Sequence, residues 1–139
     1  QESFDSKLEF EKALATRISE IDPKLIVLAG FMKVLGHQFI RLFPDKIINI
    51  HPSLLPEYPG LNTHQRALED KKKVHGVSVH QVTEDLDGGP IIAQDTVNVL
   101  PDDTPESLAK RVLEREHIIY PKVVESLANG KIRLSDYNV

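Results

Sequence analysis

The feature that most constrains the fold is a continuous apolar run from Leu25 to Ala29. A short strand that is apolar on both faces is typical of a parallel sheet covered by helices on both sides. Residues 6–20 carry apolar side chains at helical spacing, and Asp22-Pro23 ends that expected helix just before the run. The sequence therefore predicts an α/β protein whose first strand is buried and parallel to its neighbour.

The remaining elements are expected to alternate along the chain. Strands are expected over 46–51, 77–83 and 91–99, and helices over 36–43, 63–70 and 104–128. Pro121 should bend or break the last helix because proline lacks the N–H that a helix needs. The turn over 84–90 suits an antiparallel pair, which predicts a mixed sheet. A βαβ unit normally starts with a strand, so a chain that starts with a helix is expected to be a domain incomplete at its N-terminus.

Composition narrows the classes of function. The 139 residues suit a single domain, 1–139, since domains usually hold about 100–150 residues. The net charge of −4 argues against a nucleic-acid partner. The absence of cysteine excludes disulfides, thiolate catalysis and Cys-based metal sites. No apolar stretch reaches the roughly 18–20 residues of a membrane-spanning helix, and no signal peptide is visible, so a cytoplasmic protein without a membrane partner is expected.

Asn49 and His51 are the first candidates for chemistry. They are two residues apart on an expected strand, so their side chains point the same way at the end where α/β sheets place ligands. An amide donor beside a titratable imidazole suits acyl transfer, because the amide can stabilise an oxyanion and the imidazole can hold or move a proton. The alternative, which the tripeptide leaves open, is a buried pair that only satisfies loop carbonyls.

Two carboxylates are further candidates. Asp87 lies in the turn Leu86 to Pro90, where it either favours the charged form of a nearby imidazole or only stabilises its own turn. Glu116 falls inside the apolar stripe of the last expected helix, where an unpaired carboxylate is costly. It either binds a substrate or reaches water at the edge of the stripe. The six histidines show no metal-binding spacing, so no metal is expected.

Longer motifs then show a resemblance. The segments Asn49 to Pro56 and Tyr58 to Leu61 are similar to the signature of the folate-dependent formyltransferases, and most specifically to those that act on 5'-phosphoribosylglycinamide (GAR). Segments 29–32, 76–80, 84–90 and 116–121 continue the match in order and spacing. The resemblance implies a Rossmann-like formyltransferase fold with a mixed, mostly parallel sheet, here lacking its N-terminal strand or strands and the glycine-containing loop that grips the GAR phosphate.

The resemblance also implies an activity: transfer of the formyl group of 10-formyltetrahydrofolate to the amine of GAR in de novo purine biosynthesis. Asn49, His51 and Asp87 match the catalytic trio, in which Asn49 and protonated His51 stabilise the oxyanion and Asp87 keeps His51 charged. Ser78 and His80 support the trio, and Leu55-Pro56 suits a cis bond. The implied folate contacts are Lys7, Met32, Lys33, Val34, Leu35, Asn49, Thr83, Glu84, Asp85, Leu86 and Asp87. The implied GAR contacts are Leu113, Glu114, Arg115 and Glu116.

Three alternatives remain beside this interpretation. A formyltetrahydrofolate hydrolase would use the same trio with water as the acceptor, and a methionyl-tRNA formyltransferase would carry an additional basic C-terminal domain. The segment Tyr58 to Leu61 favours GAR. The third alternative is a folate-binding fragment without turnover. An exposed apolar edge on the first strand would favour a homodimer.

Overall fold

The protein is an α/β structure with eight elements in the computed structural model, which describes residues 2–23, 25–28, 36–84 and 87–134. The helices are α1 (Glu2–Ile21), α2 (His37–Leu42), α3 (Thr63–Glu69) and α4 (Pro105–Ala128). The strands are β1 (Ile26–Leu28), β2 (Ile47–His51), β3 (Val74–Gln81) and β4 (Ile91–Asn98). The expected order of elements is confirmed. None of the described helices is both long and apolar enough to cross a membrane.

The four strands form one mixed sheet in the order β1-β2-β3-β4. β1 and β2 are parallel, as expected, whereas β2–β3 and β3–β4 are antiparallel. The expected mixed α/β fold is confirmed. The sheet was expected to be mostly parallel, whereas in the described sheet β1–β2 is parallel and the other two pairs are antiparallel. The chain passes through α2 between the parallel strands β1 and β2, whereas β3 returns antiparallel to β2 after α3, and β4 follows β3 through a turn.

The first strand is less buried than its apolar sequence suggests. Ile26 and Leu28 are half-buried, and Val27 is 42% exposed. The physical reason is position, since β1 pairs only with β2 within the described sheet and is therefore an edge strand there. The expectation of a buried first strand is thus wrong for the described part of the chain.

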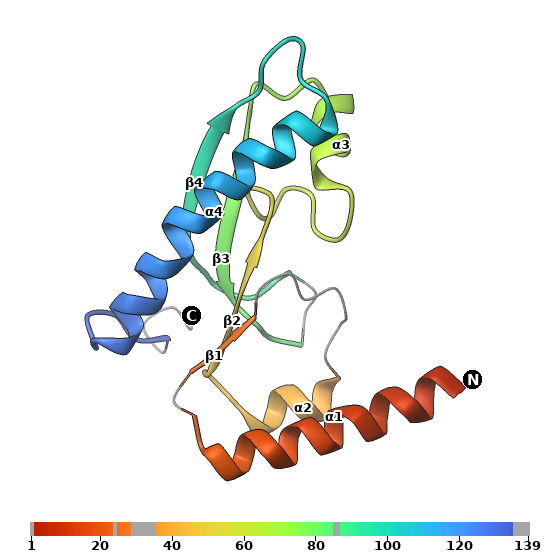
Figure 1. The fold of residues 1–139 in the computed structure, drawn as a ribbon, viewed down its shortest axis with the longest axis vertical. Coiled ribbons are helices and arrows are strands. Elements are labelled where there is room, and N and C mark those ends of the chain that lie inside the picture. Colours follow the sequence, from red (N-terminus) through yellow and green to blue (C-terminus); the bar gives the residue numbers. More distant parts are fainter. Residues whose placement is uncertain (1, 24, 29–35, 85–86, 135–139) are drawn as a thin grey trace.

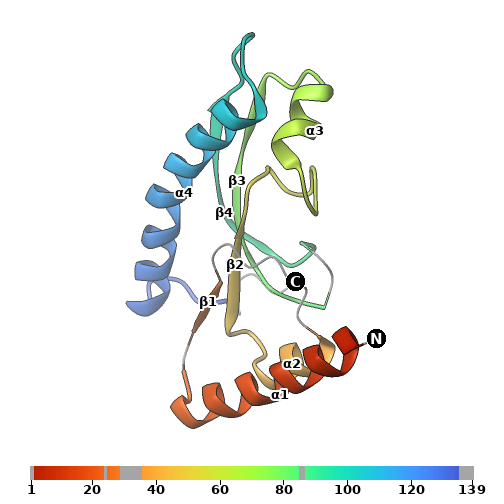
Figure 2. The same ribbon diagram turned by 45° about the vertical axis from the view of Figure 1, so that its right-hand side comes forward.

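Two apolar clusters hold the helices to the sheet. The larger one lies between α4 and the strands, where Ile48, Ile50, Val77 and Val79 meet Val112. The smaller one joins α1, α2 and the start of β2 through Ala15, Phe39, Phe43 and Ile47. Figure 1 shows α4 running along β3 and β4, while α1 and α2 lie together at the end of the sheet near β1. Figure 2 gives the same arrangement from a second direction.

Helix α4 begins with a capping box and continues through a proline. The Thr104 side chain accepts a hydrogen bond from the Ser107 N–H at 3.1 Å, and the Ser107 hydroxyl accepts one from the Thr104 N–H at 2.9 Å. The sequence predicts that Pro121 bends or breaks this helix, and the helix extends unbroken to Ala128, so the expected break does not occur. Packing explains the difference, because Tyr120 and Val123 on either side of the proline are buried in the larger cluster.

Candidate active site

The side chains of strand β2 alternate between the two faces of the sheet. Ile48 and Ile50 enter the core beneath α4, so Asn49 and His51 point to the opposite face of the sheet. The register with β3 places His80 opposite Asn49 and Ser78 opposite His51. Val77 and Val79 also lie beneath α4, which leaves Ser78 and His80 on the same face as the β2 pair. One face of two neighbouring strands therefore presents four polar side chains.

Asp87 is brought to this face by the turn that joins β3 and β4. The Gln81 N–H donates to the Pro90 carbonyl at 2.9 Å, which closes the base of the turn. Gly89 is required there, because a Cβ would lie 1.8 Å from the Gln81 carbonyl oxygen. Asp87 itself has a φ of 51°, a left-handed conformation that aspartate tolerates better than most residues. The close packing of the turn on β3 fixes where the carboxylate lies.

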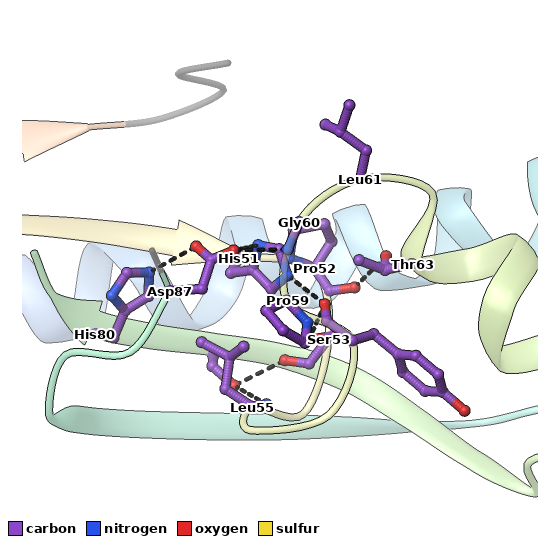
Figure 3. A network of polar contacts seen from close by, with 12 residues as sticks. His51, Pro52, Ser53, Leu55, Pro59, Gly60, Leu61, Thr63, His80 and Asp87 are labelled. Atoms are coloured by element: carbon purple, nitrogen blue, oxygen red, sulfur yellow. Dashed lines mark hydrogen bonds and ion pairs between the residues drawn. The ribbon is translucent and has the colours of Figure 1, made fainter. Parts of the chain in front are cut away.

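The carboxylate of Asp87 lies between two imidazoles (Figure 3). Its Oδ2 is 3.6 Å from His51 Nδ1, and its Oδ1 is 3.7 Å from His80 Nε2. Oδ2 also accepts a hydrogen bond from the Gly60 N–H at 2.8 Å. The side chains of Asp87 and His51 are each 8% exposed, so this charge acts where water screens it poorly. Asp87 therefore contacts groups far outside its own turn.

The His51 ring has an acceptor on each side. Its Nε2 lies 2.8 Å from the Tyr58 carbonyl, which can only accept, so Nε2 carries the hydrogen. Its Nδ1 faces the Asp87 carboxylate. A singly protonated ring would aim a lone pair at that carboxylate, whereas the imidazolium offers a donor to both acceptors. The geometry thus suits a positively charged His51.

His80 differs from His51 in its environment. Burial lowers the pKa of His80, against the weaker opposing effects of the Gln81 carbonyl and Asp87. Its Nδ1 lies 3.1 Å from the Gln81 carbonyl. Its Nε2 and the Asn49 Oδ1 are buried without a hydrogen-bond partner among the described residues. Buried polar atoms are normally satisfied, so these two mark a place that suits a polar ligand or water.

The structure brings together only some of the residues that the sequence singles out. Asn49, His51, His80 and Asp87 converge, and Thr83 and Glu84 lie nearby in the same β3–β4 turn. Glu84 pairs with Arg41 at the surface, with a separation of 3.3 Å. The segment Met32 to Leu35, Asp85 and Leu86 lie outside the described residues, as does the side chain of Lys7, whose backbone belongs to α1.

The expected acceptor contacts lie on α4, which packs against the other face of the sheet. Leu113 and Glu114 are exposed, and Arg115 lies 3.9 Å from Asp95. Glu116 is half-buried and forms no hydrogen bond or ion pair with the described residues. Burial raises the pKa of its carboxyl group, and His117 partly opposes this effect. Among the described residues, no hydrogen bond or ion pair joins this turn of α4 to the Asp87 cluster.

Sequence reasoning missed two groups that complete the cluster, the Tyr58 carbonyl and the Gly60 N–H. Both belong to the backbone, so residue type gives no direct signal of their roles. It also missed a second histidine pair, in which His64 Nδ1 lies 3.2 Å from His75 Nε2. Within the described part of the chain, no group of three or more side chains could hold a metal ion.

The comparisons with known proteins agree with this geometry. The profile of a family described as "Formyl transferase" matches residues 1–124, which include Asn49, His51, Asp87 and Glu116. The chain belongs to the formyl transferase family. The chain is 43% identical over 134 residues to the phosphoribosylglycinamide formyltransferase of Escherichia coli K12, and the match covers 96% of this chain and 63% of the relative.

Further relatives have the same description. The phosphoribosylglycinamide formyltransferase of Haemophilus influenzae is 44% identical over 136 residues, covering 98% of this chain and 64% of the relative. A solved structure of phosphoribosylglycinamide formyltransferase from Coxiella burnetii, in complex with CHES, has 54% identity and a TM-score of 0.88. The match covers 95% of this chain and 62% of the solved chain. The chain thus spans less than two thirds of the length of these relatives.

Proposed function

We propose that this chain carries the site for formyl transfer from 10-formyltetrahydrofolate to the amine of GAR, a step of de novo purine biosynthesis in the cytoplasm. The observation that carries the proposal is the buried Asp87 carboxylate between His51 and His80, next to Asn49. The relatives described as phosphoribosylglycinamide formyltransferases support the choice of acceptor. The proposal needs no metal, because protein donors can stabilise the negative charge that develops on a formyl oxygen.

Each residue of the trio has a role that fits its contacts. His51 holds a proton on Nε2 against the Tyr58 carbonyl and, when charged, a second proton on Nδ1 beside Asp87. Asp87 stabilises that charge and accepts from the Gly60 N–H. The Asn49 amide shares the face of His51 and contributes a second polar group for the formyl oxygen. The buried, poorly screened site strengthens both effects.

The two substrates require separate sets of contacts. For the folate donor we propose the β3–β4 turn from Thr83 to Asp87, together with Asn49, Lys7 and the segment Met32 to Leu35. The unsatisfied Asn49 Oδ1 and His80 Nε2 fit a polar ligand beside that turn. For GAR we propose the α4 turn from Leu113 to Glu116, in which Glu116 is a half-buried carboxylate without a described partner.

The test is a transfer assay with the 139-residue chain, 10-formyltetrahydrofolate and GAR, using His51→Ala as the control. Formylated GAR should be detected by mass spectrometry with the unaltered chain, and its rate should fall by about 10²–10⁴-fold in the control. Release of formate without formylated GAR would instead show a hydrolase. Folate binding without either product would show a binding fragment, and both of those results contradict the proposed transfer.

A further inference from the structure

Three side chains form a row across the sheet. In the strand register His51 of β2 lies opposite Ser78 of β3, and Ser78 lies opposite Gln94 of β4. Partners that lie directly opposite each other point to the same face of a sheet. Gln94 is therefore two strands away from His51 on the face that carries the candidate active site, and it forms no contact with His51 or Asp87 in the described structure.

The loop that follows β2 folds back over this row and is held there by side chains. The Ser78 hydroxyl donates to the Ser53 carbonyl at 2.7 Å and accepts from the Leu55 N–H at 3.0 Å. The Gln94 amide donates to the Leu55 carbonyl at 2.9 Å and to the Ser78 hydroxyl at 2.9 Å. Both backbone groups of Leu55 are thus satisfied by side chains from β3 and β4. Ser78 uses its one donor and two acceptor positions completely.

The same loop supplies the two backbone groups that contact the catalytic pair. After Ser53 and Leu55, the loop continues through Glu57, Tyr58, Pro59 and Gly60. The Tyr58 carbonyl binds His51 Nε2, and the Gly60 N–H binds Asp87 Oδ2. The Ser53 hydroxyl also donates to the Glu57 carbonyl, which ties the two ends of the loop together. A shift at the base of the loop would therefore move both contacts.

We propose that Gln94 is a positioning residue, which acts through Leu55 and the loop to hold the Tyr58 carbonyl against His51 and the Gly60 N–H against Asp87. This inference rests on the proposed function for its catalytic consequence, but its structural part can be measured without turnover. Gln94 is exposed on its strand, unlike the fully buried Ser78, so replacing it should leave the core intact. Misplacing a reacting group by about 1 Å can cost about 10²-fold in rate.

The experiment compares three variants of the full chain. Gln94→Leu removes the donor at similar size. Gln94→Glu removes it only while the introduced carboxyl is ionised, and regains one donor as pH falls toward about 4.3. Thr96→Val is the control, because Thr96 lies two residues along β4 on the same face, and no hydrogen bond from its hydroxyl to the described loop is present. Each variant is assayed for kcat and for KM, and the Gly60 amide and the His51 ring are followed by NMR.

We expect Gln94→Leu to lower kcat by about tenfold to 10²-fold with little change in either KM, since it misplaces groups without removing a substrate contact. The Gly60 amide signal should shift, and the His51 titration should differ from that of the unaltered chain. In Gln94→Glu, but not in Gln94→Leu, the Gly60 signal should return toward its original position as the introduced carboxyl is protonated. Thr96→Val should change none of these quantities.

Two results would overturn the proposal. One is an unaltered Gly60 signal and His51 titration in Gln94→Leu, even where thermal stability falls, because that pattern describes a purely structural residue. The other is an equal change in Thr96→Val, which would reflect a general effect of altering β4. If the unaltered chain shows no transfer, the NMR arms still decide the positioning role, so failure of the proposed function and failure of this inference are distinguishable.

Discussion

Two buried carboxylates in this protein have similar exposure and very different partners. The Asp87 side chain is 8% exposed and that of Asp103, which precedes α4, is 3% exposed. Asp103 accepts hydrogen bonds from the Arg111 guanidinium, the Ser107 hydroxyl and the Leu100 N–H. Asp87 accepts one hydrogen bond from a backbone N–H and faces two imidazoles at 3.6 and 3.7 Å.

The difference separates a structural carboxylate from one that is available for chemistry. The hydrogen bonds of Arg111, ahead of those of Ser107 and Leu100, hold the pKa of Asp103 well below its usual range despite burial. Both carboxylate oxygens of Asp103 are already occupied by hydrogen bonds, and the charge stabilises the start of α4. The partners of Asp87 are imidazoles, which can be neutral or charged, and their nitrogens lie beyond normal hydrogen-bond distance. That arrangement can still tighten when a substrate binds.

The largest effect is expected for Asp87→Asn. The amide oxygen can still accept from the Gly60 N–H, but it cannot stabilise a charged His51. We expect kcat for formyl transfer to fall by about 10²–10⁴-fold, with a smaller change in folate affinity and in the free energy of unfolding. Steady-state kinetics and thermal denaturation measure these quantities. Turnover close to that of the unaltered chain would remove Asp87 from the mechanism.

Asp103→Asn should mainly lower stability, whereas Asp87→Asn should mainly lower kcat. It breaks charged hydrogen bonds with Arg111, so we expect about 2–3 kcal/mol less stability and little change in kcat of the folded fraction. Because folding lowers the pKa of Asp103, its stabilising effect is present above the unfolded pKa of about 3.9. That effect is lost as pH falls below this value toward the lower folded pKa.

The measurement for Asp103 is urea denaturation at a series of pH values, with Asp102→Asn as the matched control. Asp102 is an exposed neighbour that forms no hydrogen bond with the described residues. The acid-dependent loss of stability should be smaller in Asp103→Asn than in the control. Equal pH dependence in the two variants would contradict a structural role for the Asp103 charge.

Glu116 is a third carboxylate for this comparison, and its substitution is expected to have the smallest effect. It is half-buried without a described partner, and burial raises its pKa, so folding favours the protonated form. Its stabilising effect is therefore present below the unfolded pKa and lost as pH rises through the folded pKa. Glu116→Gln should leave neutral-pH stability unchanged or slightly increased, within about 1 kcal/mol, while raising KM for GAR by about tenfold.

The readouts for Glu116 are KM for GAR, KM for folate and the unfolding midpoint. Glu114→Gln, an exposed change on the same turn of α4, is the matched control. A rise in KM for folate rather than for GAR would move Glu116 to the other substrate. A loss of stability at neutral pH would show that its carboxylate has a structural partner.

Much of the fold could be predicted from local patterns. Alternation on β2 predicted that Asn49 and His51 share a face, because side chains of a strand point to opposite sides in turn. Thr104-Pro105 gave the start of α4, and the expected cis bond at Leu55-Pro56 is confirmed. The helical and strand segments were placed to within a few residues, since periodicity reports the element type better than its ends.

Other features depended on neighbours that no local pattern reveals. Val27 is exposed because β1 is an edge strand of the described sheet, although its sequence suits a buried one. Pro121 is tolerated because the buried Tyr120 and Val123 hold α4 to the core. The roles of the Tyr58 carbonyl and the Gly60 N–H arise from loop geometry, in which the side chain has no part.

Local patterns in the sequence were enough to identify the chemical groups of the candidate site and to place Asn49 and His51 on one strand face. The order of the motifs indicated the family that the comparisons then established. No local pattern indicates that Asp87 lies between His51 and His80, or that Asp103 pairs with Arg111; both follow from the packing of separate elements. The physical reason is that periodicity fixes direction along one element, whereas distance and burial depend on how separate elements pack.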